Sequence, residues 1–157
     1  MADLQQDFID VIARRSHKTM IKIANSQHAF FSAEEVKQLN EMTALLNGWD
    51  GSHDLKSIAA TVYTRWYFRF ILSLFHNYSD DVDDRLSFVG NYHFTDAYQN
   101  ILKSIDEEGA KSRFQLICRG AYDVSHLDLG GNVCAYNMAR SLLEARQFLK
   151  EKMSSDP

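Results

Sequence analysis

The residues best suited to chemistry in this sequence form a Trp-Asp-Gly unit, Trp49, Asp50 and Gly51, placed directly before a long apolar segment. An aspartate in such a setting could act as an acid or base. It could equally form the corner between two helices, where a carboxylate accepts hydrogen bonds from free backbone N–H groups and a tryptophan ring packs inward. These two interpretations differ in whether the chain carries its own catalytic machinery.

A second candidate is the sequence Ser125-His126 followed by Asp128, which contains the three residue types of a hydrolytic triad. Residues this close in sequence rarely converge in triad geometry, and the chain has no G-x-S-x-G motif. We therefore expect no nucleophilic catalysis from this segment. Gly130 and Gly131, before the last predicted helix, indicate a turn, with an anion at the helix N-terminus as the alternative.

Metal-binding patterns are missing from the sequence. The six histidines show no pair at i, i+4 spacing with an acid between them, as a helical zinc site would require. Four aspartates between residues 80 and 84 lack the spacing and the final glutamate of an EF-hand, which favours a solvated loop. We predict no metal site, no cofactor site and no catalytic residue. The histidines are His17, His28, His53, His76, His93 and His126.

The two cysteines, Cys118 and Cys134, lie in no CxxC or CxxH unit. They could pair only if the fold brings them together. We predict that both are buried thiols, since free cysteine behaves as a small apolar side chain.

Length and charge limit the classes of protein. A chain of 157 residues with 45% hydrophobic residues suits one domain over residues 1–157. The net charge of −4, without a dense cluster of Lys or Arg, argues against a nucleic-acid partner. The N-terminus has no apolar signal core, and no segment approaches the ~20 apolar residues of a membrane span. The compartment stays unknown.

Periodic apolar residues predict an all-α fold, an irregular bundle of five to six helices. The only proline is Pro157, and glycines fall mainly where apolar periodicity stops. The expected helices cover residues 4–25, 33–47, 54–77, 95–105, 111–122 and 132–153. On the first of them, Leu4, Phe8, Val11, Ile12, Met20, Ile21 and Ile23 are expected to face the core.

Local signals refine these helices. Ser32 and Glu35 have the spacing of a capping box, which predicts a helix start at Ala33, and Gly48 is expected to end that helix in the left-handed conformation. Thr95 or Asp96 is expected to cap a later helix. The 54–77 helix is apolar on nearly all sides and should be central. Its expected inward residues are Ile58, Val62, Trp66, Phe70 and Leu74, and the buried stripe of the 33–47 helix is Val36, Leu39, Met42, Leu45 and Leu46.

Two motifs in register are similar to the penicillin amidase family of N-terminal-nucleophile hydrolases. The first has the form A-L-L-x-x-W-D-G followed by S-x-A-A-x-x-Y-x-x-W. The second, some forty residues upstream, has the form Q-x-D-x-x-x-x-x-A-R. Here the first motif is Ala44, Leu45, Leu46, Trp49, Asp50, Gly51, Ser57, Ala59, Ala60, Tyr63 and Trp66, and the second is Gln5, Asp7, Ala13 and Arg14.

The resemblance implies that this chain is the late helical part of such a hydrolase. In that family the Trp-Asp-Gly unit is architectural, and the nucleophile is a serine made N-terminal by self-cleavage. No functional residue of the family can be transferred to a position here, so Trp49, Asp50 and Gly51 are expected to form a structural turn. The expected partners are the remainder of a penicillin amidase-like protein or neighbouring subunits.

The complete assembly would cleave the amide of an N-acyl compound, while this chain braces the core. One alternative is a structural subunit that has lost catalysis, and another is an unrelated helical interaction module. On either docking hypothesis an exposed apolar patch should remain, and we expect it along the 54–77 helix near Tyr67, Phe68, Phe70 and Phe75.

Overall fold

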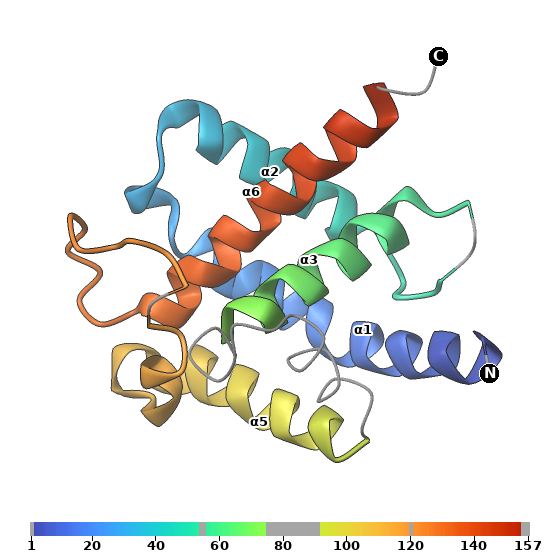
Figure 1. Ribbon diagram of the computed structural model, residues 1–157, viewed down its shortest axis with the longest axis horizontal. Helices are drawn as coiled ribbons and strands as arrows, with labels where there is room; N and C mark the ends of the chain where they lie inside the picture. Colours follow the sequence, from blue (N-terminus) through green and yellow to red (C-terminus); the bar gives the residue numbers. More distant parts are fainter. Residues whose placement is uncertain (1, 54–55, 75–91, 120, 155–157) are drawn as a thin grey trace.

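Five α-helices make up most of the part of the chain that the computed structural model describes, residues 2–53, 56–74, 92–119 and 121–154 (Figure 1). They are α1 (Ala2–Asn25), α2 (Ala33–Asn47), α3 (Ile58–Leu74), α5 (Tyr92–Glu108) and α6 (Val133–Ser154). Three 3-10 helices join them, η1 (His28–Phe30), η2 (Gly109–Lys111) and η3 (Arg113–Leu116). These residues contain no β-strand, which confirms the all-α prediction.

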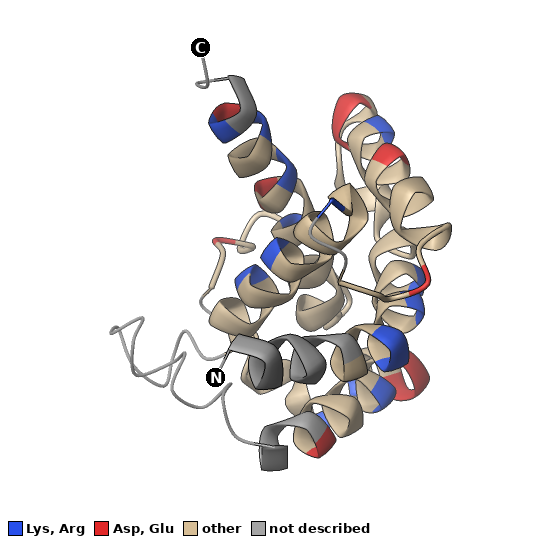
Figure 2. Cartoon of the chain, turned by 90° about the vertical axis from the view of Figure 1, so that its right-hand side faces the viewer, with Lys and Arg blue, Asp and Glu red and all other residues tan. Residues whose placement is uncertain are grey.

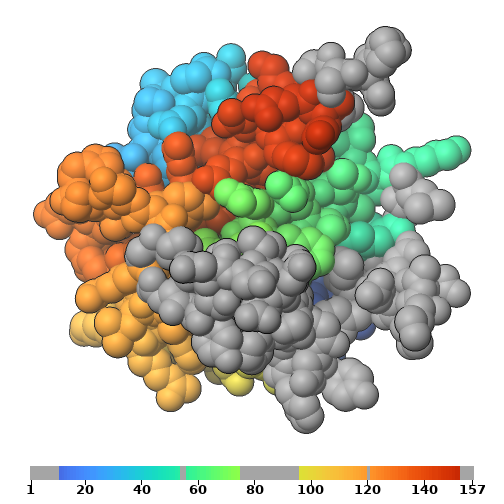
Figure 3. Space-filling model, in the orientation of Figure 1, coloured from blue at the N-terminus to red at the C-terminus, as the bar shows by residue number. Residues whose placement is uncertain are grey.

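The helices α3 and α6 form the centre of the bundle. They make the most extensive contact between any two described elements, and their surfaces adjoin in Figure 3. The helix α1 contacts α5, α2 and α6, so it joins these three helices into one bundle. Trp66 on α3 is fully buried, and its indole N–H donates to the Met138 carbonyl oxygen of α6 over 2.8 Å. This bond satisfies the only polar atom of a ring that burial would otherwise leave unpaired.

Burial on α3 extends around most of the helix, as its composition predicts. Val62, Trp66, Phe70 and Leu74 are buried as expected. Ile58, the first residue of the helix, is the exception, because it is 62% exposed. Tyr63, Tyr67 and Ile71 are also buried.

The start of α2 matches its prediction in detail. The Ser32 hydroxyl accepts from the Glu35 backbone N–H over 3.3 Å, and the Glu35 carboxylate accepts from the Ser32 N–H over 2.9 Å. The predicted left-handed end at Gly48 is wrong, because Gly48 has φ −81° and ψ −4°. The chain reverses three residues later, at Gly51, where φ is +85°.

The buried stripes of α1 and α2 are partly as predicted. Ile12, Met20, Ile21 and Ile23 are buried, whereas Val11 is 44% exposed. Leu39, Met42 and Leu46 are buried on α2, whereas Leu45 is 39% exposed. The side chains of Leu4 and Phe8 lie outside the described part of the structure.

Three predicted boundaries are wrong. The helix α3 begins at Ile58 rather than at Asp54, because the Ser57 hydroxyl accepts from the Ala60 backbone N–H and fixes the first turn there. The helix α5 begins at Tyr92, so Thr95 and Asp96 lie inside it. Residues 111–122 do not form a continuous helix: Gly109 has φ +53°, and the Ser112 hydroxyl caps the short η3 by accepting from Phe114. The predicted loop at residues 79–85 lies outside the described residues.

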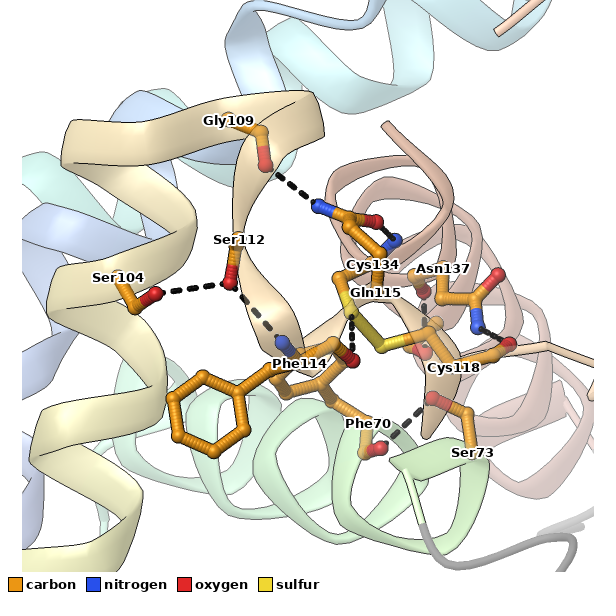
Figure 4. The surroundings of a disulfide bond; sticks show 11 residues. Phe70, Ser73, Ser104, Gly109, Ser112, Phe114, Gln115, Cys118, Cys134 and Asn137 are labelled. Atoms are coloured by element: carbon orange, nitrogen blue, oxygen red, sulfur yellow. Dashed lines mark hydrogen bonds between the residues drawn. A yellow bond between two sulfur atoms is a disulfide. The ribbon is translucent and has the colours of Figure 1, made fainter. Parts of the chain in front are cut away.

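The prediction of two free thiols is wrong, because Cys118 and Cys134 form a disulfide (Figure 4). The segment after η3 folds back on the first turn of α6 and places the two Cα atoms 5.1 Å apart, within bonding range. Both residues are fully buried, as predicted. Gln115 and Asn137 hold the same junction: Gln115 Oε1 accepts from the Cys134 N–H over 2.9 Å, and Asn137 Nδ2 donates to the Cys118 carbonyl oxygen over 2.7 Å.

Charged residues lie on the outward faces of the helices. Along α6 basic and acidic residues are interspersed (Figure 2). Two ion pairs tie α6 to α2, Arg140–Glu35 at 2.7 Å and Arg146–Glu41 at 3.2 Å. Among the described helices, none has both the length and the apolar character needed to cross a bilayer.

Candidate functional site

The Trp49 ring lies between α1, the following loop and α3. It is 8% exposed, and its ring centroid lies 5.5 Å from that of His17, 5.4 Å from that of His53 and 5.2 Å from that of Tyr63. The indole N–H donates to the Ser52 carbonyl oxygen over 2.8 Å. The ring therefore joins α1 to α3 through the turn and leaves no polar group available to a substrate.

Asp50 closes the turn on itself. One carboxylate oxygen accepts from the Ser52 hydroxyl over 2.6 Å and from the Ser52 backbone N–H over 2.9 Å. The hydroxyl bond, followed by the backbone bond, holds the pKa of Asp50 below its ordinary value. The cap of α3 comes from Ser57 instead, whose hydroxyl accepts from the Ala60 backbone N–H. An exposed carboxylate with a lowered pKa is a poor proton acceptor at neutral pH.

Gly51 lets the turn approach the backbone of α1. A Cβ atom at this position would lie 2.7 Å from Arg14 Cγ and 3.0 Å from Arg14 Cα. Two segments that the sequence motifs single out, Ala13-Arg14 and Trp49-Asp50-Gly51, are therefore in direct contact. Ala13 is itself fully buried, and its carbonyl oxygen is 2.7 Å from His17 Nδ1.

A serine, a histidine and a tyrosine lie behind the turn without forming a catalytic relay. The Ser16 hydroxyl donates to the Ile12 carbonyl oxygen over 2.6 Å and lies 2.7 Å from the Tyr63 hydroxyl. Burial raises the pKa of Tyr63, with the Ser16 bond opposing it. His17 bonds its own helix through Nδ1, while its Nε2 is buried with no hydrogen-bond partner among the described residues. Ser16 is thus held by a carbonyl and a phenol rather than by a base.

A prediction tests the turn electrostatically. Replacing Ser52 with alanine should raise the pKa of Asp50 toward its ordinary value, because the larger of its two stabilising bonds is lost. Since the folded-state pKa is lowered, the stabilising effect of this carboxylate is present above its unfolded-state pKa and disappears as pH falls through the folded-state value. Carboxyl-carbon NMR titration of the parent and of Ser52→Ala measures both midpoints. Identical midpoints would contradict the turn geometry.

The Ser125-His126-Asp128 segment does not assemble a triad. The Ser125 hydroxyl donates to Asp123 over 2.7 Å, and one Asp128 oxygen accepts from the Gly130 N–H over 3.3 Å. His126 is exposed. Asp123 and Asp128 therefore each stabilise a local turn.

Gly130 and Gly131 both have positive φ and form the turn that leads into α6. The side chain of Gln115 already occupies one free N–H of the first turn of α6, that of Cys134. Among the described residues no three His, Cys, Asp or Glu side chains are grouped so that they could hold a metal ion. The aspartates at residues 80–84 lie outside the described residues.

One pocket of the structure was not expected from the sequence. It has a volume of about 380 Å³ and lies between η1, the start of α2, the loop before α6 and α6 itself. Phe31 and Tyr136 stack along it with ring centroids 5.1 Å apart, beside the Arg140–Glu35 ion pair. Its lining comes from four separate segments, so no local motif could have indicated it. The ion pair neutralises its own charge, and the hydroxyl of the lining residue Tyr122 donates to Glu144 Oε2 over 3.1 Å.

The fold and the turn together define an all-α helical region whose motif residues are architectural. The family model described as penicillin amidase matches residues 1–157, the whole chain. The chain therefore belongs to the penicillin amidase family. A search of curated proteins and a search of solved structures each returned no match.

Proposed function

We propose that this chain is a non-catalytic helical portion of a penicillin amidase-like amide hydrolase. In this proposal the complete assembly cleaves an N-acyl amide with a nucleophile supplied by another part of the protein. The observation that supports it most directly is the role of the three motif residues in the structure. The Trp49 ring is buried, Asp50 closes a local turn, and Gly51 lets the turn approach the backbone of α1. Membership of the penicillin amidase family supports amide hydrolysis as the reaction of the complete assembly. The packing of the turn against α1 supports the proposal that this chain braces the core.

An apolar groove provides the surface through which the chain would contact the catalytic remainder. It has a volume of about 460 Å³ and lies between α2, the start of α3 and the C-terminal half of α6. Leu45 and Ile58, the exposed apolar residues noted above, both line it. Its other lining residues are Met42, Val62, Leu149, Arg146 and Lys150.

The exposed apolar surface does not lie where the sequence predicted it. Tyr67 and Phe70 are buried and Phe68 is half-buried, so the middle of α3 is covered by the chain itself. Phe75 lies outside the described residues. The exposed apolar surface is instead at the start of α3. Lys150 borders it, while the charge of Arg146 is already paired with Glu41, so the groove suits an apolar segment of the catalytic remainder that carries a carboxylate beside Lys150.

The purified chain should show no turnover of chromogenic N-acyl amides. The side chains of its family motif are engaged in packing, and the Ser16 hydroxyl donates to a backbone carbonyl. The Ser125 hydroxyl donates to Asp123, whose pKa the Ser125 bonds hold below its ordinary value, so this carboxylate is a weak base. Activity is measured by release of the chromophore, with repurified protein as the control for contaminating hydrolases. Turnover that survives repurification and disappears on replacing one side chain would refute the non-catalytic role.

Replacing Ile58 with aspartate should abolish association with the catalytic polypeptide encoded in the flanking DNA. It should also reduce binding of a hydrophobic dye by the isolated chain, because a carboxylate would lie in the apolar groove. Leu116→Asp is the matched control, since Leu116 is 64% exposed on η3 and is not among the groove residues. Equal effects of the two substitutions would refute the groove as the docking surface.

The flanking DNA also separates the proposal from its alternative. A nucleophile-bearing segment upstream and a W-x-W-G segment downstream would support the hydrolase portion. Stable association with other polypeptides that lack any such nucleophile would instead favour a structural subunit that has lost catalysis.

A further inference from the structure

The disulfide lies where solvent cannot reach it. Cys118 and Cys134 are both fully buried, beneath the contact between the η3 segment and α6 (Figure 4). Phe114 and Ile117 pack against the same core cluster. A thiol in this position would be out of reach of a disulfide reagent, and its apolar surroundings would disfavour the reactive thiolate.

Non-covalent bonds hold the same junction. The main-chain groups of both cysteines are bonded to side chains of the opposite segment, Cys134 to Gln115 and Cys118 to Asn137. Gln115 Nε2 also donates to the Gly109 carbonyl oxygen over 2.9 Å, which ties in the end of α5. Once these bonds form, the two sulfur atoms are enclosed whether or not they are already joined.

We propose that Cys118 and Cys134 are an oxidation site that is modified before α6 closes over the η3 segment. One cysteine thiolate attacks an external disulfide, forms a mixed disulfide and releases one thiolate of the reagent. The thiolate of the second cysteine then attacks the mixed disulfide, forms the internal bond and releases the other reagent thiolate. The chain loses two electrons and two protons, and the external disulfide is reduced to two thiols.

This order of events has a consequence for the folded protein. Reduction needs a thiolate to reach one of the enclosed sulfur atoms, so it proceeds only through molecules in which the η3 segment has opened. The folded chain is thus protected from reductants that act on it after folding.

The first test measures access. Oxidised chain is treated with dithiothreitol in buffer or in urea, quenched with an alkylating reagent and analysed by mass spectrometry. We expect both cysteines to stay unlabelled in buffer and to be labelled in urea, with reduction about 100-fold slower in buffer because only the open fraction reacts. Leu116→Cys, at an exposed position two residues from Cys118, is the accessible control and should be labelled in buffer. Rapid reduction in buffer would overturn the proposal.

The second test measures the order of oxidation and folding. Chain reduced in urea is diluted into buffer with glutathione disulfide already present, or is first refolded under reductant and then given glutathione disulfide. We expect fast formation of the bond in the first case and a rate about 100-fold lower in the second, with circular dichroism reporting whether the reduced chain has folded. A reduced chain that cannot fold would also support the proposal. A reduced chain that folds and then oxidises as fast as in urea would overturn it, and so would a chain that never oxidises even when glutathione disulfide is present from the start of refolding.

Discussion

Replacement of Trp49 by alanine is expected to lower the free energy of unfolding by about 3–5 kcal/mol, the usual range for removing a buried aromatic ring. The ring fills the space between His17, His53 and Tyr63, so its removal leaves a cavity that joins α1, the turn and α3. Its hydrogen bond to the Ser52 carbonyl is lost as well. Urea unfolding followed by circular dichroism measures the difference, and Trp66 remains as a fluorescent reporter of the core.

Trp49→Phe is the control for this substitution. It keeps most of the ring packing and removes the indole N–H, so it should lose clearly less stability than the alanine variant. An alanine variant that melts within about one or two degrees of the parent would show that the ring contributes little packing energy, and the architectural interpretation of the turn would fail.

Replacement of Gly51 by alanine is expected to lower the free energy of unfolding by about 2–4 kcal/mol. Two costs combine in this estimate. The backbone φ of +85° is unfavourable for any residue with a Cβ, and the added atom would lie 3.0 Å from Arg14 Cα, on backbone that cannot move aside as a flexible side chain would. The same urea titration measures this effect.

Gly130→Ala separates the two costs. Gly130 has φ +54°, but a Cβ there would have no atom within 4 Å, so it reports the conformational cost alone. The Gly51 variant should therefore lose more stability than the Gly130 variant. Equal losses would mean that the turn and α1 are not in close contact in solution.

Local signals explain why the helices could be predicted from the sequence. The capping box at Ser32 and Glu35 is a contact between residues three apart, so residue types alone indicate it. The apolar composition of α3 likewise predicts burial on most sides, and the structure confirms this from Val62 to Leu74. Ile58 is exposed because it lies in an open groove between α2, α3 and α6, and helical periodicity carries no information on where neighbouring helices leave a groove.

The features that the sequence did not predict depend on contacts between distant segments. The cysteines are 16 residues apart, and nothing in their spacing indicates that η3 returns to the first turn of α6. The residue types around the Trp-Asp-Gly unit do not indicate which donors Asp50 meets. In the structure it accepts from the Ser52 hydroxyl and N–H, while Ser57 caps α3. The aromatic pocket beside Arg140 likewise exists only after four segments meet.

The contact between Gly51 and Arg14 constrains how the sequence can vary during evolution. The turn meets α1 through the backbone and the first side-chain atoms of residue 14, so most side chains at that position would present the same surface to it. Position 51, in contrast, has room only for a hydrogen atom. Among natural variants of this chain we therefore expect substitutions at position 14 to accumulate freely with respect to this contact. A change at position 51 would survive only together with a shift of the turn away from α1.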